Sequence, residues 1–213
     1  MRKLNSIVCT GVTVIAAQGS LVFTKPVDAN PFKKAKSSIS QADNAKEQED
    51  MGSKIGVNDQ APDIALPDQH GNTISLKSFH GKKVVVFYFY PKDNTSVCTA
   101  EACTFRDSYE SFSELGAEVI GVSSDSVDSH KKFAEKHHLP FPLLADTGGM
   151  ARKAFGVPNS VGILPGRVTY VIDKTGVVRY VFNSMMDGSK HVTEAMRIVK
   201  ELGEDKGTDK PAS

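Results

Sequence analysis

Blocks of apolar and polar residues along the chain predict strands and helices in turn. The most apolar block, VVVFYFY at residues 84–90, predicts a strand buried on both faces of a sheet. After it, apolar residues recur every three or four positions, which predicts an amphipathic helix capped by Thr95 or Ser96. Glu101 is expected at another angle of that helix, away from the apolar stripe. The stripe consists of Cys98, Ala102, Phe105, Tyr109 and Phe112.

Shorter blocks on both sides of this unit complete the predicted fold. The remaining strands are expected as a small hairpin at residues 64–66 and 73–76, single strands at 118–123 and 141–145, and a hairpin at 167–172 and 177–183. Further helices are expected at residues 126–138, 150–155 and 190–202. Strands that alternate with helices and end in a hairpin and a closing helix predict an α/β sheet with helices on both faces.

The first 53 residues have a different pattern. Arg2 and Lys3 precede an uncharged run and then small residues, the layout of a secretory signal peptide over residues 1–29. Residues 30–53 begin rich in lysine and serine, as transit peptides are, and end as a polar linker. We therefore predict one compact domain at residues 54–203, not membrane-spanning in its mature form, and a flexible tail at 204–213.

Composition and charge exclude several classes of protein. The 213 residues are 39% hydrophobic and 24% charged, which is ordinary globular usage and argues against disorder or a multi-span membrane protein. A net charge of +1 and the absence of Trp argue against a nucleic-acid partner. Only Cys9, Cys98 and Cys103 are cysteines, too few for a disulfide scaffold or a Cys-rich zinc site. Cys98 and Cys103 are the only close pair.

Cys98 is the candidate nucleophile. It falls in the first turn of the predicted helix, where unpaired backbone N–H groups and the helix dipole favour the reactive thiolate. A small core residue, or half of a structural disulfide, would fit the same position. Position alone therefore leaves three interpretations of Cys98 open.

Histidines and a short acidic motif elsewhere suggest no second site. His130, His137 and His138 lie on one predicted helix, and we expect them on its solvated face rather than at a zinc ion. The DTG triplet at residues 146–148 occurs once, and we expect it to be a turn after a strand.

Two motifs around Cys98 give the sequence its specificity. PKDNTSVC at residues 91–98 matches the PxxxTxxC motif of peroxiredoxins, and CTAEACTFRD at 98–107 resembles the CTxxxCxFRD run of the peroxiredoxin Q, or bacterioferritin comigratory protein, subgroup. LPGRVTYV at residues 164–171 is most similar to the chloroplast members. The resemblance covers about residues 57–202. It implies a thioredoxin-like fold with a central mixed sheet, helices on both faces and no bound metal or cofactor.

The resemblance also implies an activity and a role for each site residue. The family reduces hydrogen peroxide and organic hydroperoxides to water and alcohols, using thioredoxin as electron donor. Cys98 would be the peroxidatic cysteine, Thr95 would hydrogen-bond to the thiolate and peroxide, and Pro91 would shield the pocket. Arg167 would be the active-site arginine. Cys103 would be the resolving cysteine, which condenses with the Cys98 sulfenic acid to a disulfide.

Helix geometry adds a prediction about that disulfide. Residues five apart on an α-helix have Cα atoms roughly 8.7 Å apart, whereas a disulfide spans no more than about 7 Å. The first turns of the helix must therefore unwind before Cys98 and Cys103 can pair.

One departure from the family is local: Ser96-Val97 stand where many members carry Pro-Gly. We expect the pocket to persist, and comparison of Val97→Gly with the parent would show whether the change affects substrate range and rate.

Two other functions fit the same fold. A thiol-disulfide oxidoreductase is one alternative, although the CxxC motif is missing. A redox-silent binding domain with the two cysteines bridged is the other.

The presequence predicts a plastid protein delivered through a secretory-type bipartite presequence, with secretion or an endomembrane lumen as the alternative. The family analogy predicts a monomer, because one chain carries both cysteines.

Overall fold

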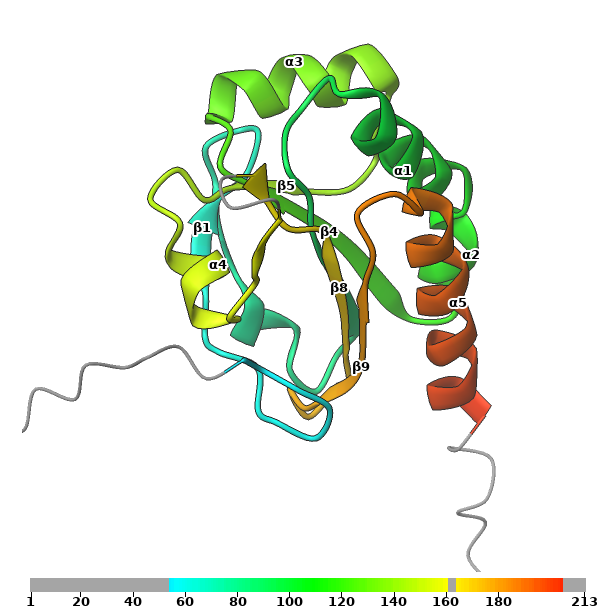
Figure 1. Ribbon diagram of the computed structural model, residues 1–213. Helices are drawn as coiled ribbons and strands as arrows, with labels where there is room; N and C mark the ends of the chain where they lie inside the picture. Colours follow the sequence, from blue (N-terminus) through cyan, green and yellow to red (C-terminus); the bar gives the residue numbers. More distant parts are fainter. Residues whose placement is uncertain (1–53, 161–163, 205–213) are drawn as a thin grey trace, which may run out of the picture. The chain divides into compact units, whose positions relative to one another are not determined.

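A five-stranded mixed sheet forms the centre of the computed structural model, which describes residues 54–160 and 164–204 (Figure 1). The strand order is β5-β4-β3-β8-β9, with β3, β4 and β5 parallel and β8 and β9 antiparallel to their neighbours. The strands are β3 (Val84–Phe89), β4 (Ala117–Ser123), β5 (Leu143–Ala145), β8 (Val168–Ile172) and β9 (Val178–Asn183). The predicted mixed α/β sheet is confirmed.

The central strand β3 is buried along its whole length, as its apolar run predicts. Side chains alternate between the two faces of a strand, so β3 supplies both halves of the core. Val86 and Tyr88 face one cluster of apolar residues, whereas Phe87 and Phe89 face the other. This arrangement leaves the end of β3 at Pro91 as the natural place for a site between the sheet and its helices.

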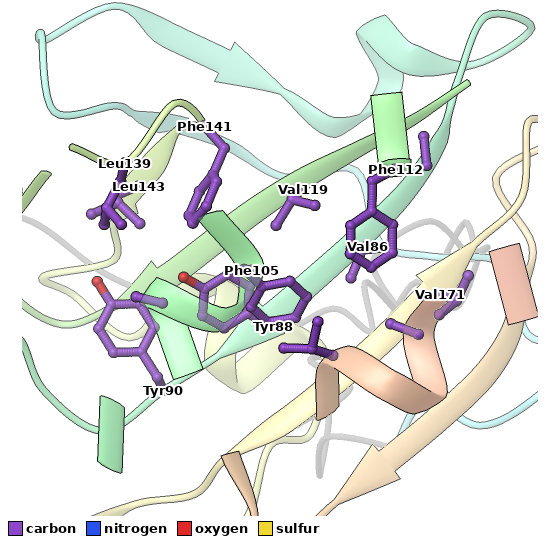
Figure 2. Packing of buried hydrophobic residues seen from close by; sticks show 14 of the residues in the cluster. Val86, Tyr88, Tyr90, Phe105, Phe112, Val119, Leu139, Phe141, Leu143 and Val171 are labelled. Atoms are coloured by element: carbon purple, nitrogen blue, oxygen red, sulfur yellow. The ribbon is translucent and has the colours of Figure 1, made fainter. Parts of the chain in front are cut away.

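Four helices contribute apolar side chains to the first of these clusters. They are α1 (Ser96–Asp107), α2 (Tyr109–Glu114), α3 (Val127–His137) and α5 (Gly188–Glu204). Figure 2 shows aromatic rings of this cluster packed together, and the rings of Tyr88 and Phe105 stack with centroids 4.5 Å apart. Because Phe105 lies on the same helix as Cys98, this packing fixes α1 against the sheet.

The opposite face is covered by smaller elements. They are the hairpin of β1 (Ala65–Pro67) and β2 (Thr73–Ser75), the 3-10 helix η1 (Leu76–Phe79) and the helix α4 (Met150–Ala154). The ring of Phe155 packs on Phe87 with centroids 5.2 Å apart. Asp146 accepts hydrogen bonds from the backbone N–H groups of Ala151 and Arg152, so the DTG triplet is the predicted turn. Helices therefore lie on both faces, as expected.

Some boundaries differ from the prediction. The apolar stripe predicts one helix, but α1 ends at Asp107 and α2 starts at Tyr109, because Ser108 has φ −103° and ψ 0°, away from ideal helical values. A two-stranded pair, β6 (Asn159–Ser160) with β7 (Leu164–Pro165), was not predicted. The helix α5 begins at Gly188 and reaches Glu204, one residue beyond the predicted domain end.

The predictions for residues 1–53 and for the tail from 205 onward lie outside the described residues. Within residues 54–160 and 164–204, no helix is both long enough and apolar enough to cross a membrane.

Candidate active site

Cys98 lies where β3 leads through a short loop into α1. Its side chain is only 2% exposed, at the base of a pocket of about 530 Å³ that also contains Pro91, Thr95 and Arg167. The structure therefore brings four of the five predicted site residues together. Other residues that line the pocket are Ser96, Val97, Asp125, Pro165, Met185 and Met186.

Arg167 contacts Cys98 directly. Its buried guanidinium donates a hydrogen bond from Nη2 to Cys98 Sγ at 3.2 Å and from Nε to the carbonyl of Met185 at 3.2 Å. A third donor, Nη1, bonds to Glu101 Oε2. A guanidinium held from three sides keeps its positive charge in a fixed position beside the sulfur.

Glu101 corrects the prediction for the polar side of α1. It is fully buried against Arg167, because a residue three positions after Cys98 lies on the same side of the helix. Burial raises the pKa of Glu101, and the guanidinium opposes that rise. Sequence reasoning missed this residue, although its spacing from Cys98 was a usable signal.

Thr95 and Pro91 line the pocket without contacting the sulfur through a hydrogen bond. The Thr95 hydroxyl donates to the Lys92 carbonyl at 3.0 Å, and no hydrogen bond in the described part of the chain joins Thr95 to Cys98. Thr95 is the N-cap of α1 as expected, but its side chain makes no capping bond. Pro91 is half-buried at the end of β3.

A buried network holds the loop before Cys98, and it contradicts the prediction that His130 is solvated. His130 is fully buried, with Nδ1 3.0 Å from Asp93 Oδ2 and Nε2 3.2 Å from the Leu144 carbonyl oxygen. Tyr90 and Ser129 donate hydroxyl hydrogen bonds to the same carboxylate, each at 2.7 Å. Helix periodicity could not reveal this network, because the carboxylate comes from a distant loop.

Asp93 carries the charge of this network. Burial opposes its ionisation, but hydrogen bonds from His130, Ser129 and Tyr90 hold the pKa of Asp93 below its usual value. Its backbone N–H also donates to Asp125 Oδ2 at 2.9 Å. The loop that leads to Cys98 is thus tied to α3 and to the end of β4.

Cys103 is half-buried and lies further along α1, outside the pocket that holds Cys98. Its Sγ lies 3.9 Å from His137 Nδ1, so His137 is not on a purely solvated face either, whereas His138 is exposed as expected. Both Cys98 and Cys103 are free thiols, and α1 is unbroken between them. No group of three or more His, Cys, Asp or Glu side chains within residues 54–160 and 164–204 is placed to hold a metal ion.

A buried thiol beside a guanidinium, at the start of a helix that follows the central strand of a mixed sheet, is typical of thiol-based peroxidases with a thioredoxin-like fold. The AhpC/TSA family profile matches residues 57–181. The chain is 51% identical to chloroplastic peroxiredoxin Q of Triticum aestivum over 150 residues, 70% of this chain and 69% of the relative. It is 48% identical to the Arabidopsis thaliana protein of that name over 148 residues, 69% and 68% of the two chains.

Solved structures agree with this assignment. Peroxidoxin BcpB from Mycobacterium tuberculosis superposes with a TM-score of 0.65 at 35% identity, over 69% of this chain and 97% of that one. Xanthomonas campestris peroxiredoxin Q gives 0.57 at 31% identity, over 63% and 90%. The chain belongs to the AhpC/TSA family and, within it, to the peroxiredoxin Q subfamily. It is therefore an oxidoreductase with peroxidase activity, and the predicted thioredoxin-like fold is confirmed.

Proposed function

We propose that the chain is a thiol-specific peroxidase that reduces hydrogen peroxide and organic hydroperoxides through a Cys98 sulfenic acid. The observation that carries this proposal is the 3.2 Å contact of Arg167 Nη2 with Cys98 Sγ inside the pocket. A structure of Xanthomonas campestris bacterioferritin comigratory protein, 30% identical with a TM-score of 0.59, concerns alkyl peroxide reduction by that protein. The half-exposed Met185 and exposed Met186 give this pocket an apolar rim suited to organic substrates.

The first step is attack of the Cys98 thiolate on one peroxide oxygen. The O–O bond breaks, the sulfur is oxidised to sulfenic acid, and the other oxygen leaves as hydroxide or alkoxide and takes a proton. Arg167 is placed to stabilise negative charge as it moves from the sulfur to the leaving oxygen. The Thr95 hydroxyl, which donates to the Lys92 carbonyl, can accept a hydrogen bond at the pocket wall, and Pro91 limits access of water to the sulfur.

The second step is condensation of the sulfenic acid with the Cys103 thiol, which releases water and forms an intramolecular disulfide. An intact α1 holds the two Cα atoms roughly 8.7 Å apart, beyond the about 7 Å that a disulfide spans. The first turns of α1 therefore unwind in this step. Thioredoxin then reduces the disulfide and returns both thiols.

Substitution of each cysteine tests this sequence of steps. Peroxide consumption is followed with thioredoxin, thioredoxin reductase and NADPH. Cys98→Ser is expected to abolish turnover, because no thiolate remains in the pocket. Cys103→Ser is expected to consume one equivalent of peroxide and then stop. Cys9→Ser is the matched control and should turn over like the parent. Unchanged peroxide loss in Cys98→Ser and Cys103→Ser would instead support a redox-silent binding domain.

Localisation and organisation complete the proposal. Residues 1–29 and 30–53 act as a signal-like and transit-like presequence that delivers the 54–203 domain to a plastid, where it works as a monomer. The two plant relatives named above, from Triticum aestivum and Arabidopsis thaliana, are named as chloroplastic proteins. A fluorescent fusion of residues 1–51 tests the proposed localisation. Plastid fluorescence supports it, whereas secretion or retention in an endomembrane lumen contradicts it.

A further inference from the structure

His137 is held in a fixed position beside Cys103. Its Nδ1 lies 3.9 Å from Cys103 Sγ, within the range of a hydrogen bond to sulfur. The ring packs edge-on against Phe133 with centroids 5.0 Å apart, and the His137 carbonyl accepts a hydrogen bond from Arg106 Nη1 at 2.9 Å. Its Nε2 is buried without a hydrogen-bond partner in the described part of the chain. Among the described residues, the polar contact of this ring is therefore the Cys103 thiol.

The surroundings of His137 keep the ring neutral. Burial lowers its pKa, and the positive charges of Lys136 and Arg106, with His138, lower it further. Lys136 and His138 are its neighbours along the chain at the end of α3, whereas Arg106 and Cys103 face it from α1. A neutral imidazole has one nitrogen lone pair free to accept a proton. His137 is thus ready to accept a proton near pH 7.

We propose that His137 is the general base of the resolving step. The inference rests on the proposed function, because it requires a Cys98 sulfenic acid. His137 takes the proton of the Cys103 thiol as the Cys103 sulfur attacks the Cys98 sulfur. The S–S bond forms, the S–O bond breaks, and the leaving hydroxide takes the proton back from His137 as water. The sulfenic sulfur is reduced and the Cys103 sulfur is oxidised, so no further oxidant is needed.

The packing of α1 explains how His137 can act although part of this helix unwinds. Ala102 and Phe105 are fully buried on either side of Cys103, and Arg106 bonds to the end of α3. The half of α1 that carries Cys103 is therefore anchored beside His137. Of the residues before it, Ser96 and Ala100 are exposed, whereas the buried Cys98 and Glu101 are held by Arg167. In the resolving step Cys98 therefore moves towards Cys103, and Cys103 stays beside His137.

The experiment separates the two half-reactions in the full chain with a Cys9→Ser background, which leaves only Cys98 and Cys103 as thiols. One equivalent of hydrogen peroxide is mixed in, and samples are quenched in acid. Peroxide loss reports attack by Cys98, dimedone adducts report the sulfenic acid, and mass after thiol alkylation reports the disulfide. His137→Gln is compared with the parent and with His70→Gln, at an exposed histidine in the turn between β1 and β2.

We expect His137→Gln to consume its equivalent of peroxide at the parent rate and to form the disulfide about 10²-fold more slowly, the usual size of a lost general base. The parent rate of disulfide formation should fall in acid as His137 becomes protonated, at a pH below the ordinary histidine value because the pKa of His137 is lowered. The variant should lack this acidic limb, and added imidazole should restore disulfide formation in His137→Ala. If the rate and pH profile of disulfide formation in His137→Gln equal those of His70→Gln, the inference is overturned. Failure of the parent to consume peroxide would instead refute the proposed function.

Discussion

Arg167 joins three distant parts of the chain at the sulfur of Cys98. Its guanidinium donates to Cys98 on α1, to Glu101 one turn further on, and to the carbonyl of Met185 after β9. A planar guanidinium can make these three bonds at once, whereas a lysine ammonium is a single compact charge. Lysine at this position would keep the positive charge but could not make the same three directed hydrogen bonds.

Arg167→Lys therefore tests whether direction matters as well as charge. We expect the rate of the first peroxide equivalent to fall by about 10²- to 10³-fold, as when one fixed donor to a developing oxyanion is removed. Stopped-flow competition with a second peroxidase for the same peroxide measures this rate. Arg179→Lys, at an exposed arginine paired with Asp173, is the matched control and should leave the rate unchanged. A rate for Arg167→Lys within about twofold of the parent would contradict the role of the guanidinium.

Single residues show what the sequence can and cannot predict about the site. The PxxxTxxC motif placed Pro91, Thr95 and Cys98 correctly in one pocket, because these residues are neighbours along the chain. Glu101 and His130 were missed: the spacing of Glu101 from Cys98 was a usable signal, but the buried partner of each residue lies far away in sequence. Glu101 meets Arg167 across 66 positions, and His130 meets Asp93 across 37.

At the scale of elements, the helix α1 has to meet two opposing structural requirements. It must stay helical to keep Cys98 beside Arg167, and in the proposed resolving step it must unwind to let Cys98 reach Cys103. In its first half Ser96 and Ala100 are exposed and Cys98 and Glu101 are held by Arg167, whereas its second half packs through Phe105. The unwinding stays a prediction that follows from local helix geometry alone. The break at Ser108 could not be predicted, because the apolar stripe continues across it.

Ala100→Gly weakens the first half of α1 without removing a core contact, because Ala100 is exposed. Glycine costs about 1 kcal/mol relative to alanine inside a helix, which corresponds to about a fivefold change in the unwinding equilibrium. We therefore expect the disulfide to form up to about fivefold faster after one equivalent of peroxide, measured by quenched alkylation. Lys200→Gly makes a similar change at an exposed position of α5 and should leave this rate unaltered. Equal rates in Ala100→Gly and the parent would show that unwinding does not limit the step.

At the scale of the whole molecule, the closing helix α5 connects the far edge of the sheet to the site. It contacts β8, β9 and α1, and it carries the fully buried His191. The ring bonds to the Thr169 hydroxyl through Nδ1 at 2.8 Å and to the Ser184 carbonyl through Nε2 at 2.9 Å. Nε2 donates to the carbonyl and Nδ1 accepts from the hydroxyl, so the neutral ring satisfies both partners. The general α/β plan could be predicted from apolar periodicity. The buried hydrogen bonds of His191 could not, since they depend on how α5 packs against the sheet.

The neutral ring makes the fold sensitive to acid. Burial lowers the pKa of His191 to about 4, from an ordinary value of 6.5; the Ser184 carbonyl opposes this shift and the Arg167 charge adds to it. The unfolded chain therefore binds a proton at a pH where the folded chain does not. The stabilisation is complete above about pH 6.5 and is lost as the pH falls towards 4.

At pH 5 the expected loss of unfolding free energy from His191 is about 2 kcal/mol relative to pH 7. Urea unfolding of the parent and of His191→Gln at both pH values isolates this contribution, because other titrating groups are common to the two proteins. A glutamine side chain does not titrate, so the stability advantage of the parent should shrink by this amount at pH 5. His70→Gln, at an exposed histidine, should show no such change relative to the parent. An advantage of the parent over His191→Gln that stays constant between pH 7 and 5 would mean that His191 accepts its proton without disturbing the docking of α5.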